Sequence, residues 1–163
     1  MIYLLDSNIL ITAYQNYYSF DICPGFWRLL IEQYEKEKIY SIDKVQFELS
    51  SQTDELADWV QEELPGAFFL DSGEDATISK FGEYMIWAQQ KDQFLDAAKE
   101  EFATVADAWL IAHAHAIGAT VVTLEVFNPD IKKKIPIPNV CREFGVEAID
   151  TFEMMRRLGM TLV

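Results

Sequence analysis

Short apolar runs alternate with longer helical segments along the chain, and this alternation constrains the fold more than any other feature. The runs are rich in Ile, Leu and Val, as buried strands are. Helical segments between consecutive strands rule out tight hairpins and favour parallel pairing with helices on both faces of the sheet. The sequence therefore predicts an α/β fold of three layers, α/β/α, around a central, mostly parallel sheet of four or five short strands.

The expected elements follow from periodicity and from Gly, Pro and capping residues. Strands are predicted at residues 2–5, 39–41, 67–70, 120–124 and 146–149. Helices are predicted at 8–14, 25–38, 44–50, 54–64, 74–101 with a break near Lys91, from Thr104 to Gly118, near Val140, and after a cap at Asp150 or Thr151. No repeat, low-complexity tract or linker interrupts the pattern, so we expect one domain over residues 1–163.

The chain is strongly acidic. Its 27 acidic and 13 basic residues give a formal charge of -14, which repels nucleic acids and membranes unless positive groups or metal ions are concentrated locally. No segment approaches the roughly 20 apolar residues that span a bilayer, so no membrane association is expected. Cys23 and Cys141 fit no disulfide or metal-binding pattern, which indicates free thiols in a cytoplasmic protein.

The stretch YLLDSNIL places Asp6 directly after an apolar strand. Burying an unpaired carboxylate is costly. Either Asp6 or Ser7 caps the following helix, or Asp6 faces a ligand, since ligands of open parallel sheets bind beyond the carboxyl ends of the strands.

Three further acids have similar alternatives. Asp107 interrupts the apolar stripe of its helix, but Thr104 to Asp107 also fits a capping box. Glu48 could pair with Lys44 on a helix surface. Glu125 follows the strand TVVTL as Asp6 follows the first strand, or is a solvated loop residue. If these acids converge, they repel one another unless cations lie among them.

Oxygen-only ligands favour Mg²⁺ or Mn²⁺, and the chemistry such ions support best is phosphoryl transfer to water. No G-x-S-x-G, P-loop or G-x-G-x-x-G motif is present, which argues against serine hydrolases, nucleotide triphosphatases and dinucleotide enzymes. His113 and His115 lie on different sides of one helix and cannot form a dyad.

Four segments together resemble the PIN-domain proteins, in particular VapC-like toxin ribonucleases: LLDSNIL, FEL with Glu48, ADAWLIAHA with Asp107, and TVVTLEV with Thr123 and Glu125. The segments YYSFDICPGFW and KKKIPIPNVCREFGV further resemble an uncharacterised PIN subfamily. The likeness covers nearly the whole chain. It implies a PIN-like fold and an acidic metal site that cleaves RNA, and it assigns metal binding to Asp6, Glu48 and Asp107, with Ser7 or Asn8 and Thr123 as polar support.

One position departs from the pattern of that family. Where the family commonly has an Asp two residues after the Thr of its fourth motif, this chain has Glu125, which leaves either Glu125 or Asp130 as the fourth acid. Lys132, Lys133 and Lys134 form the one dense basic run, and they either contact RNA phosphates beside the site or form a solvated turn.

The resulting functional prediction is a metal-dependent endoribonuclease, the toxin of a toxin–antitoxin pair, using Mg or Mn. The expected partners are an RNA substrate, an antitoxin protein and a second copy of the chain, the last suggested by apolar residues near Trp59 and Trp87. Two alternatives remain: an inactive PIN-like module that binds RNA or a partner protein, and a phosphatase that forms an aspartyl-phosphate on Asp6, although Asn8 replaces the second Asp which such enzymes require.

Overall fold

The computed structural model describes all residues 1–163 and has a central sheet of five strands, all parallel, in the order β3-β2-β1-β4-β5. All five predicted strands are present, each short. Their bounds are β1 (Tyr3–Leu5), β2 (Ile39–Ile42), β3 (Phe69–Leu70), β4 (Thr120–Val122) and β5 (Ala148–Ile149).

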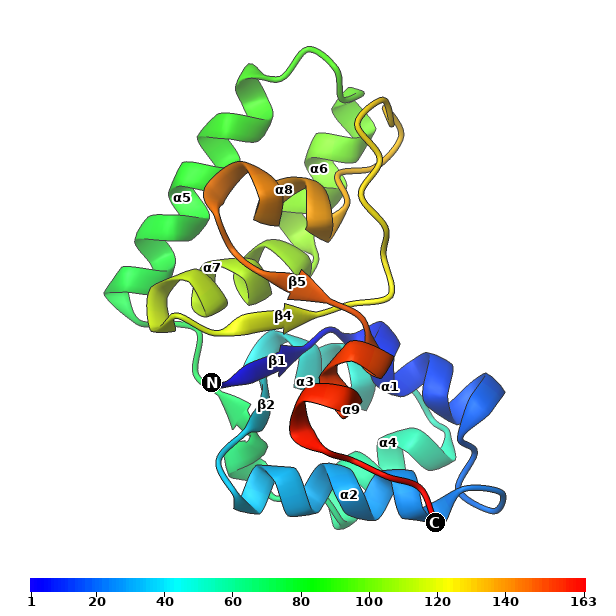
Figure 1. Cartoon of the computed structure of the whole chain (residues 1–163). Helices are drawn as coiled ribbons and strands as arrows, with labels where there is room; N and C mark the ends of the chain where they lie inside the picture. The colour runs from blue at the N-terminus through cyan, green and yellow to red at the C-terminus, as the bar shows by residue number, and fades with distance from the viewer.

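Helices cover both faces of this sheet. They are α1 (Ser7–Thr12), a π-helical turn η1 (Ala13–Tyr17), α2 (Pro24–Glu35), α3 (Asp43–Ser50), α4 (Glu55–Glu62), a 3-10 turn η2 (Gly66–Phe68), α5 (Asp75–Gln90), α6 (Asp96–Thr104), α7 (Asp107–Ile117), α8 (Ile137–Phe144) and α9 (Thr151–Leu158). Figure 1 shows α5 to α8 on one side of the sheet and α1 to α4 with α9 on the other. The predicted three-layer α/β/α fold is therefore confirmed.

Burial explains why the strands are uniformly apolar. Leu4 and Leu5 of β1 are fully buried, because helices cover both faces of the central strand. The buried hydrophobic side chains form one continuous core. Helix α7 ends at Gly118, as the sequence predicts, and α8 and α9 end in the same way at Gly145 and Gly159; all three glycines take the left-handed conformation that glycine adopts without strain.

One predicted helix start is wrong. Thr104 does not cap α7 but ends α6, where its hydroxyl donates to the carbonyls of Glu100 and Glu101, and α7 begins at Asp107. Val105 takes an extended conformation between the two helices. The chain therefore turns sharply after α6, and Asp107 starts a new helix instead of completing a capping box.

Trp59 and Trp87 mark the apolar regions through which a second copy of the chain is expected to bind. Trp59 and Trp87 are half-buried and pack against the core. The association of the chain with a second copy of itself remains a prediction. No helix combines the length and the apolar character needed to cross a membrane.

The order of the strands fixes where a ligand would bind. From the central β1, the chain moves to β2 and β3 on one side and later to β4 and β5 on the other, so the direction of winding reverses between β1 and β4 (Figure 1). Crevices form at such switch points, beyond the carboxyl ends of the two strands. Asp6 and Thr123 are the residues that directly follow β1 and β4.

Candidate active site

Asp6 lies at this switch point with only 2% of its surface exposed. It occupies the N-cap position of α1, yet its side chain makes no capping hydrogen bond. Its Oδ2 instead accepts from the Thr123 hydroxyl at 3.2 Å, and its Oδ1 lies 3.5 Å from the Ser7 hydroxyl that donates to it. The carboxylate is therefore turned toward β4. Asn8, the other candidate for polar support, is exposed and makes no side-chain hydrogen bond.

Glu125 is connected to Asp6 by hydrogen bonds through the Thr123 hydroxyl. Its backbone N–H donates to the Thr123 hydroxyl at 3.1 Å, while its Oε1 accepts from the N–H of Ile137 at 3.2 Å and lies 3.5 Å from Lys134 Nζ. Its other carboxylate oxygen, Oε2, is buried without any partner. Asp130 is exposed, so Glu125 is the acid of this loop that faces Asp6.

Glu48 and Asp107 approach from α3 and α7. Glu48 is half-buried, and its Oε1 accepts from the backbone N–H of Ala106 at 3.2 Å. This bond joins α3 to the start of α7, where Asp107 is the first residue. The surface pair of Glu48 with Lys44 does not form, because the Lys44 ammonium binds Asp43 and Ser72 instead.

The four acids act on one another electrostatically. Burial raises the pKa of Asp6 to about 6, with further contributions from Glu125 and Glu48, while the Thr123 hydrogen bond opposes the shift. Burial, then Asp6 and Glu125, raise the pKa of Asp107 to about 8. Burial also raises the pKa of Glu48, against the Ala106 hydrogen bond. Groups with such shifts gather where proteins do chemistry.

Lys134 is the basic residue that enters this cluster. Burial would lower the pKa of its ammonium, but Glu125 and Asp107 outweigh that effect and raise it. Lys132 and Lys133 are exposed. The basic run is thus divided, with one ammonium among the acids and two in solvent.

As the side chains lie, no group of three or more His, Cys, Asp or Glu is close enough to hold a metal ion. The acids are therefore electrostatic neighbours rather than a preassembled ligand set. Their chemistry nevertheless suits a hard divalent cation, because all donors are carboxylate oxygens and one of them, Glu125 Oε2, is buried without a partner.

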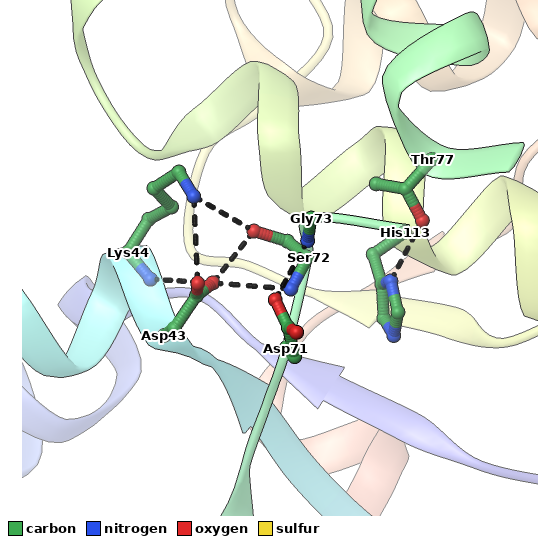
Figure 2. A network of polar contacts seen from close by, with 7 residues as sticks. All are labelled: Asp43, Lys44, Asp71, Ser72, Gly73, Thr77 and His113. Atoms are coloured by element: carbon green, nitrogen blue, oxygen red, sulfur yellow. Dashed lines mark hydrogen bonds and ion pairs between the residues drawn. The ribbon is translucent and has the colours of Figure 1, made fainter. Parts of the chain in front are cut away.

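A second polar network, beside the site, was not predicted from the sequence. Figure 2 shows Asp43 at its centre, accepting at Oδ1 from the backbone N–H groups of Lys44 and Ser72 and from the Ser72 hydroxyl at 2.6 Å. Lys44 Nζ lies 3.4 Å from Asp43 Oδ2 and 3.1 Å from Ser72 Oγ. The spacing of Lys44 and Glu48 on one helix suggested that these two side chains pair. The partner that Lys44 contacts instead, Ser72, follows strand β3 and is distant in the sequence.

His113 has a structural role in the same region. Its Nδ1 lies 2.9 Å from the Thr77 hydroxyl, and both side chains are buried (Figure 2). His115 contacts the Tyr84 hydroxyl at 2.8 Å through its own Nδ1. The two histidines bind different partners and neither joins the acids.

Comparison with known proteins gives one family and a fold relationship. The sequence profile of a family described as "Domain of unknown function (DUF4411)" matches residues 3–162. No curated protein matches the chain. Among solved structures, this chain is similar to one chain of the crystal structure of VapBC2 from Rickettsia felis bound to a DNA fragment from the VapBC2 promoter. The two chains superpose with a TM-score of 0.54 at 17% sequence identity, and the match covers 92% of this chain and 98% of the other. The two chains share the PIN-like fold predicted from the sequence.

Proposed function

Because the chain belongs to the DUF4411 family, whose description assigns no activity, we propose its function from the site itself: a metal-dependent endoribonuclease, the toxin half of a toxin–antitoxin pair. The observation that carries this proposal is the gathering of Asp6, Glu48, Asp107 and Glu125 at the switch point of the sheet, where burial and the neighbouring acids raise the pKa of Asp6 and of Asp107. Mutual repulsion among acids that are half-buried or buried has no structural benefit, whereas it suits a site that binds cations.

Three of the four acids are oriented by a hydrogen bond from a neighbouring segment of the chain. The Thr123 hydroxyl donates to Asp6, the Ala106 N–H donates to Glu48, and the Ile137 N–H donates to Glu125. Such bonds fix carboxylates in place, as the partners of metal ligands do. Lys134 adds a positive charge beside Glu125, suited to contact a phosphate oxygen of the substrate.

Asp6, Glu48, Asp107 and Glu125 would hold one or two Mg²⁺ or Mn²⁺ ions. When bound, such an ion polarises a phosphodiester and makes water a better nucleophile. The raised pKa values mean that Asp6 and Asp107 release their protons more readily when a cation balances their charge. We therefore expect cleavage to require the metal and to increase with pH through the range in which these acids ionise.

The test is cleavage of single-stranded RNA by chelator-treated protein with Mn²⁺ or Mg²⁺ restored, beside Asp6→Asn/Asp107→Asn. Asp58→Asn/Asp92→Asn is the matched control, because it makes the same change in charge at two exposed acids. We expect the parent and the control to cleave and the site variant to be inactive. A site variant that cleaves at the parent's rate would refute the proposal.

A binding module without catalysis is the second candidate. It is favoured by the absence of any three acids within reach of one ion. RNA or protein binding that persists in chelator and in the site variant would support it. The aspartyl-phosphate alternative is weaker, because Asn8 is exposed and no second acid stands two residues after Asp6.

The antitoxin part of the proposal draws on the fold shared with the VapBC2 chain and on the charge of -14, which suits a partner with basic residues. Growth arrest on expression, relieved by a protein encoded beside this one, would support the toxin role. Unimpaired growth with verified accumulation of active protein would argue against it.

A further inference from the structure

A groove runs along α3 and the start of α7, directly beside the candidate active site. It has a volume of about 570 Å³, and its walls include Asp43, Lys44, Phe47 and Glu48 of α3, facing Thr104 and Trp109. Small-ligand sites have volumes of roughly 300–1,000 Å³. Glu48 belongs both to this groove and to the acids of the site, so a ligand that engages the acids extends naturally into the groove.

Phe47 is the most unusual residue of this groove. It precedes Glu48 on α3, yet 78% of its surface is exposed. A phenyl ring this open leaves a face free for stacking. Aromatic side chains stack on unpaired bases whatever the base identity.

Lys44 supplies a fixed hydrogen-bond donor in the same groove. Phe81 stacks on Trp109 with ring centroids 3.8 Å apart, too close to admit another group, so Lys44 Nζ lies over the other face of Trp109, 4.8 Å from the ring centre. Asp43 and Ser72 hold the same ammonium by hydrogen bonds (Figure 2). An ammonium has three N–H groups, so one remains for a ligand.

We propose that this groove binds one unpaired nucleobase of the RNA, next to the scissile phosphate at the acidic site; this rests on the proposed function. The base stacks on Phe47, and Lys44 donates to an oxygen or ring nitrogen on its edge. Because the base is uncharged, Asp43 and Glu48 do not repel it. Since a paired base is not available for stacking on a protein ring, the groove selects single-stranded RNA.

A protein partner fits the groove less well. A stable interface buries about 800 Å² on each partner and has an apolar centre. Among the residues that line the groove, Phe47 is the one large hydrophobic side chain that is strongly exposed, and charged residues surround it. The groove therefore has the size and chemistry of a base subsite.

The test measures the affinity of a fluorescein-labelled single-stranded RNA dodecamer of random sequence in the Asp6→Asn/Asp107→Asn background, which lacks two of the proposed metal ligands, so that RNA stays intact. Phe47→Ala is expected to raise Kd about 5- to 150-fold, the loss of one stacked base. Phe47→Tyr keeps the ring and should bind as the background protein does. Ile86→Ala, an exposed hydrophobic residue of α5, is the matched control and should have no effect.

Folding does not confound this test, because the Phe47 side chain is exposed and Phe47→Tyr restores binding only if the ring itself matters. Unchanged affinity in Phe47→Ala, or equal affinity in Phe47→Leu, which lacks the ring, would overturn the subsite. Absence of RNA binding in the background protein would overturn it as well. Loss of a protein partner in Phe47→Ala, with RNA affinity unchanged, would assign the groove to that partner instead.

The same variants separate this inference from the proposed function. If the parent cleaves RNA and Phe47→Ala leaves its KM unchanged, the subsite is wrong and the nuclease proposal stands. If RNA binding depends on Phe47 but the parent never cleaves, the subsite stands and the protein is a binding module.

Discussion

Replacing Asp107 by Asn should stabilise the metal-free protein, because Asp107 is charged in the unfolded chain but resists ionisation in the folded one. Its pKa rises from 3.8 to about 8 on folding. The folded state therefore binds the proton more tightly, so this residue's contribution to stability is complete below about pH 4 and is lost as pH rises to about 8. The parent should become steadily less stable across that range.

The size of the effect follows from the shift. At pH 7, the difference between the pH and the unfolded-state pKa of 3.8 sets an upper limit of about 4 kcal/mol on the gain in unfolding free energy when Asp107 is replaced, at about 1.4 kcal/mol per pKa unit. Asp107 is only half-buried, so water and movement of the facing acids should reduce this to about 2 kcal/mol. For a chain of 163 residues, that is an increase in Tm of about 4 to 8 °C.

Thermal unfolding followed by circular dichroism, in chelator from pH 5 to 9, measures this directly. Asp107→Asn should melt above the parent, with a gap that widens toward pH 8, and Asp92→Asn, at an exposed acid, should match the parent throughout. Mn²⁺ should raise the Tm of the parent and leave that of Asp107→Asn unchanged. Equal Tm values for the parent and Asp107→Asn at pH 8 in chelator would refute the electrostatic reasoning.

Three further changes have definite expected outcomes. Lys134→Met removes the ammonium beside Glu125 and should tighten Mn²⁺ binding roughly 2- to 10-fold, measured by calorimetry, because the metal no longer competes with that charge; weaker binding would contradict this. Thr77→Val leaves buried His113 without its partner and should cost about 1–3 kcal/mol in urea unfolding, whereas Thr77→Ser should cost less. Leu4→Ala, at a fully buried position of the central strand, should cost about 2–5 kcal/mol in the same assay, and a much smaller loss would mean that the core closes around the gap.

The layered architecture could be predicted because it depends on local patterns. A parallel strand covered on both faces must be apolar throughout, and the helices between strands can be recognised by their periodicity and by end signals such as Gly118. Asp6 and Glu125 were recognised because each follows a strand, and Asp107 because it interrupts an apolar stripe, whereas Glu48 was singled out as an acid on an intervening helix. Local patterns failed at Thr104, where a capping box fitted the sequence but the chain turns between two helices.

The sequence by itself determined the α/β class, the five strands and the acids from which a site could be made. Only the tertiary structure decided what those acids do. Whether Asp6 caps α1 or faces a site depends on the hydroxyl of Thr123, which lies 117 residues later and reaches Asp6 only because β1 and β4 pair. The partner of Lys44 was likewise decided by Ser72 of a distant segment. Periodicity in the sequence shows which face of a helix or strand is buried. Which partner a side chain contacts depends on how the helices and strands are arranged in space.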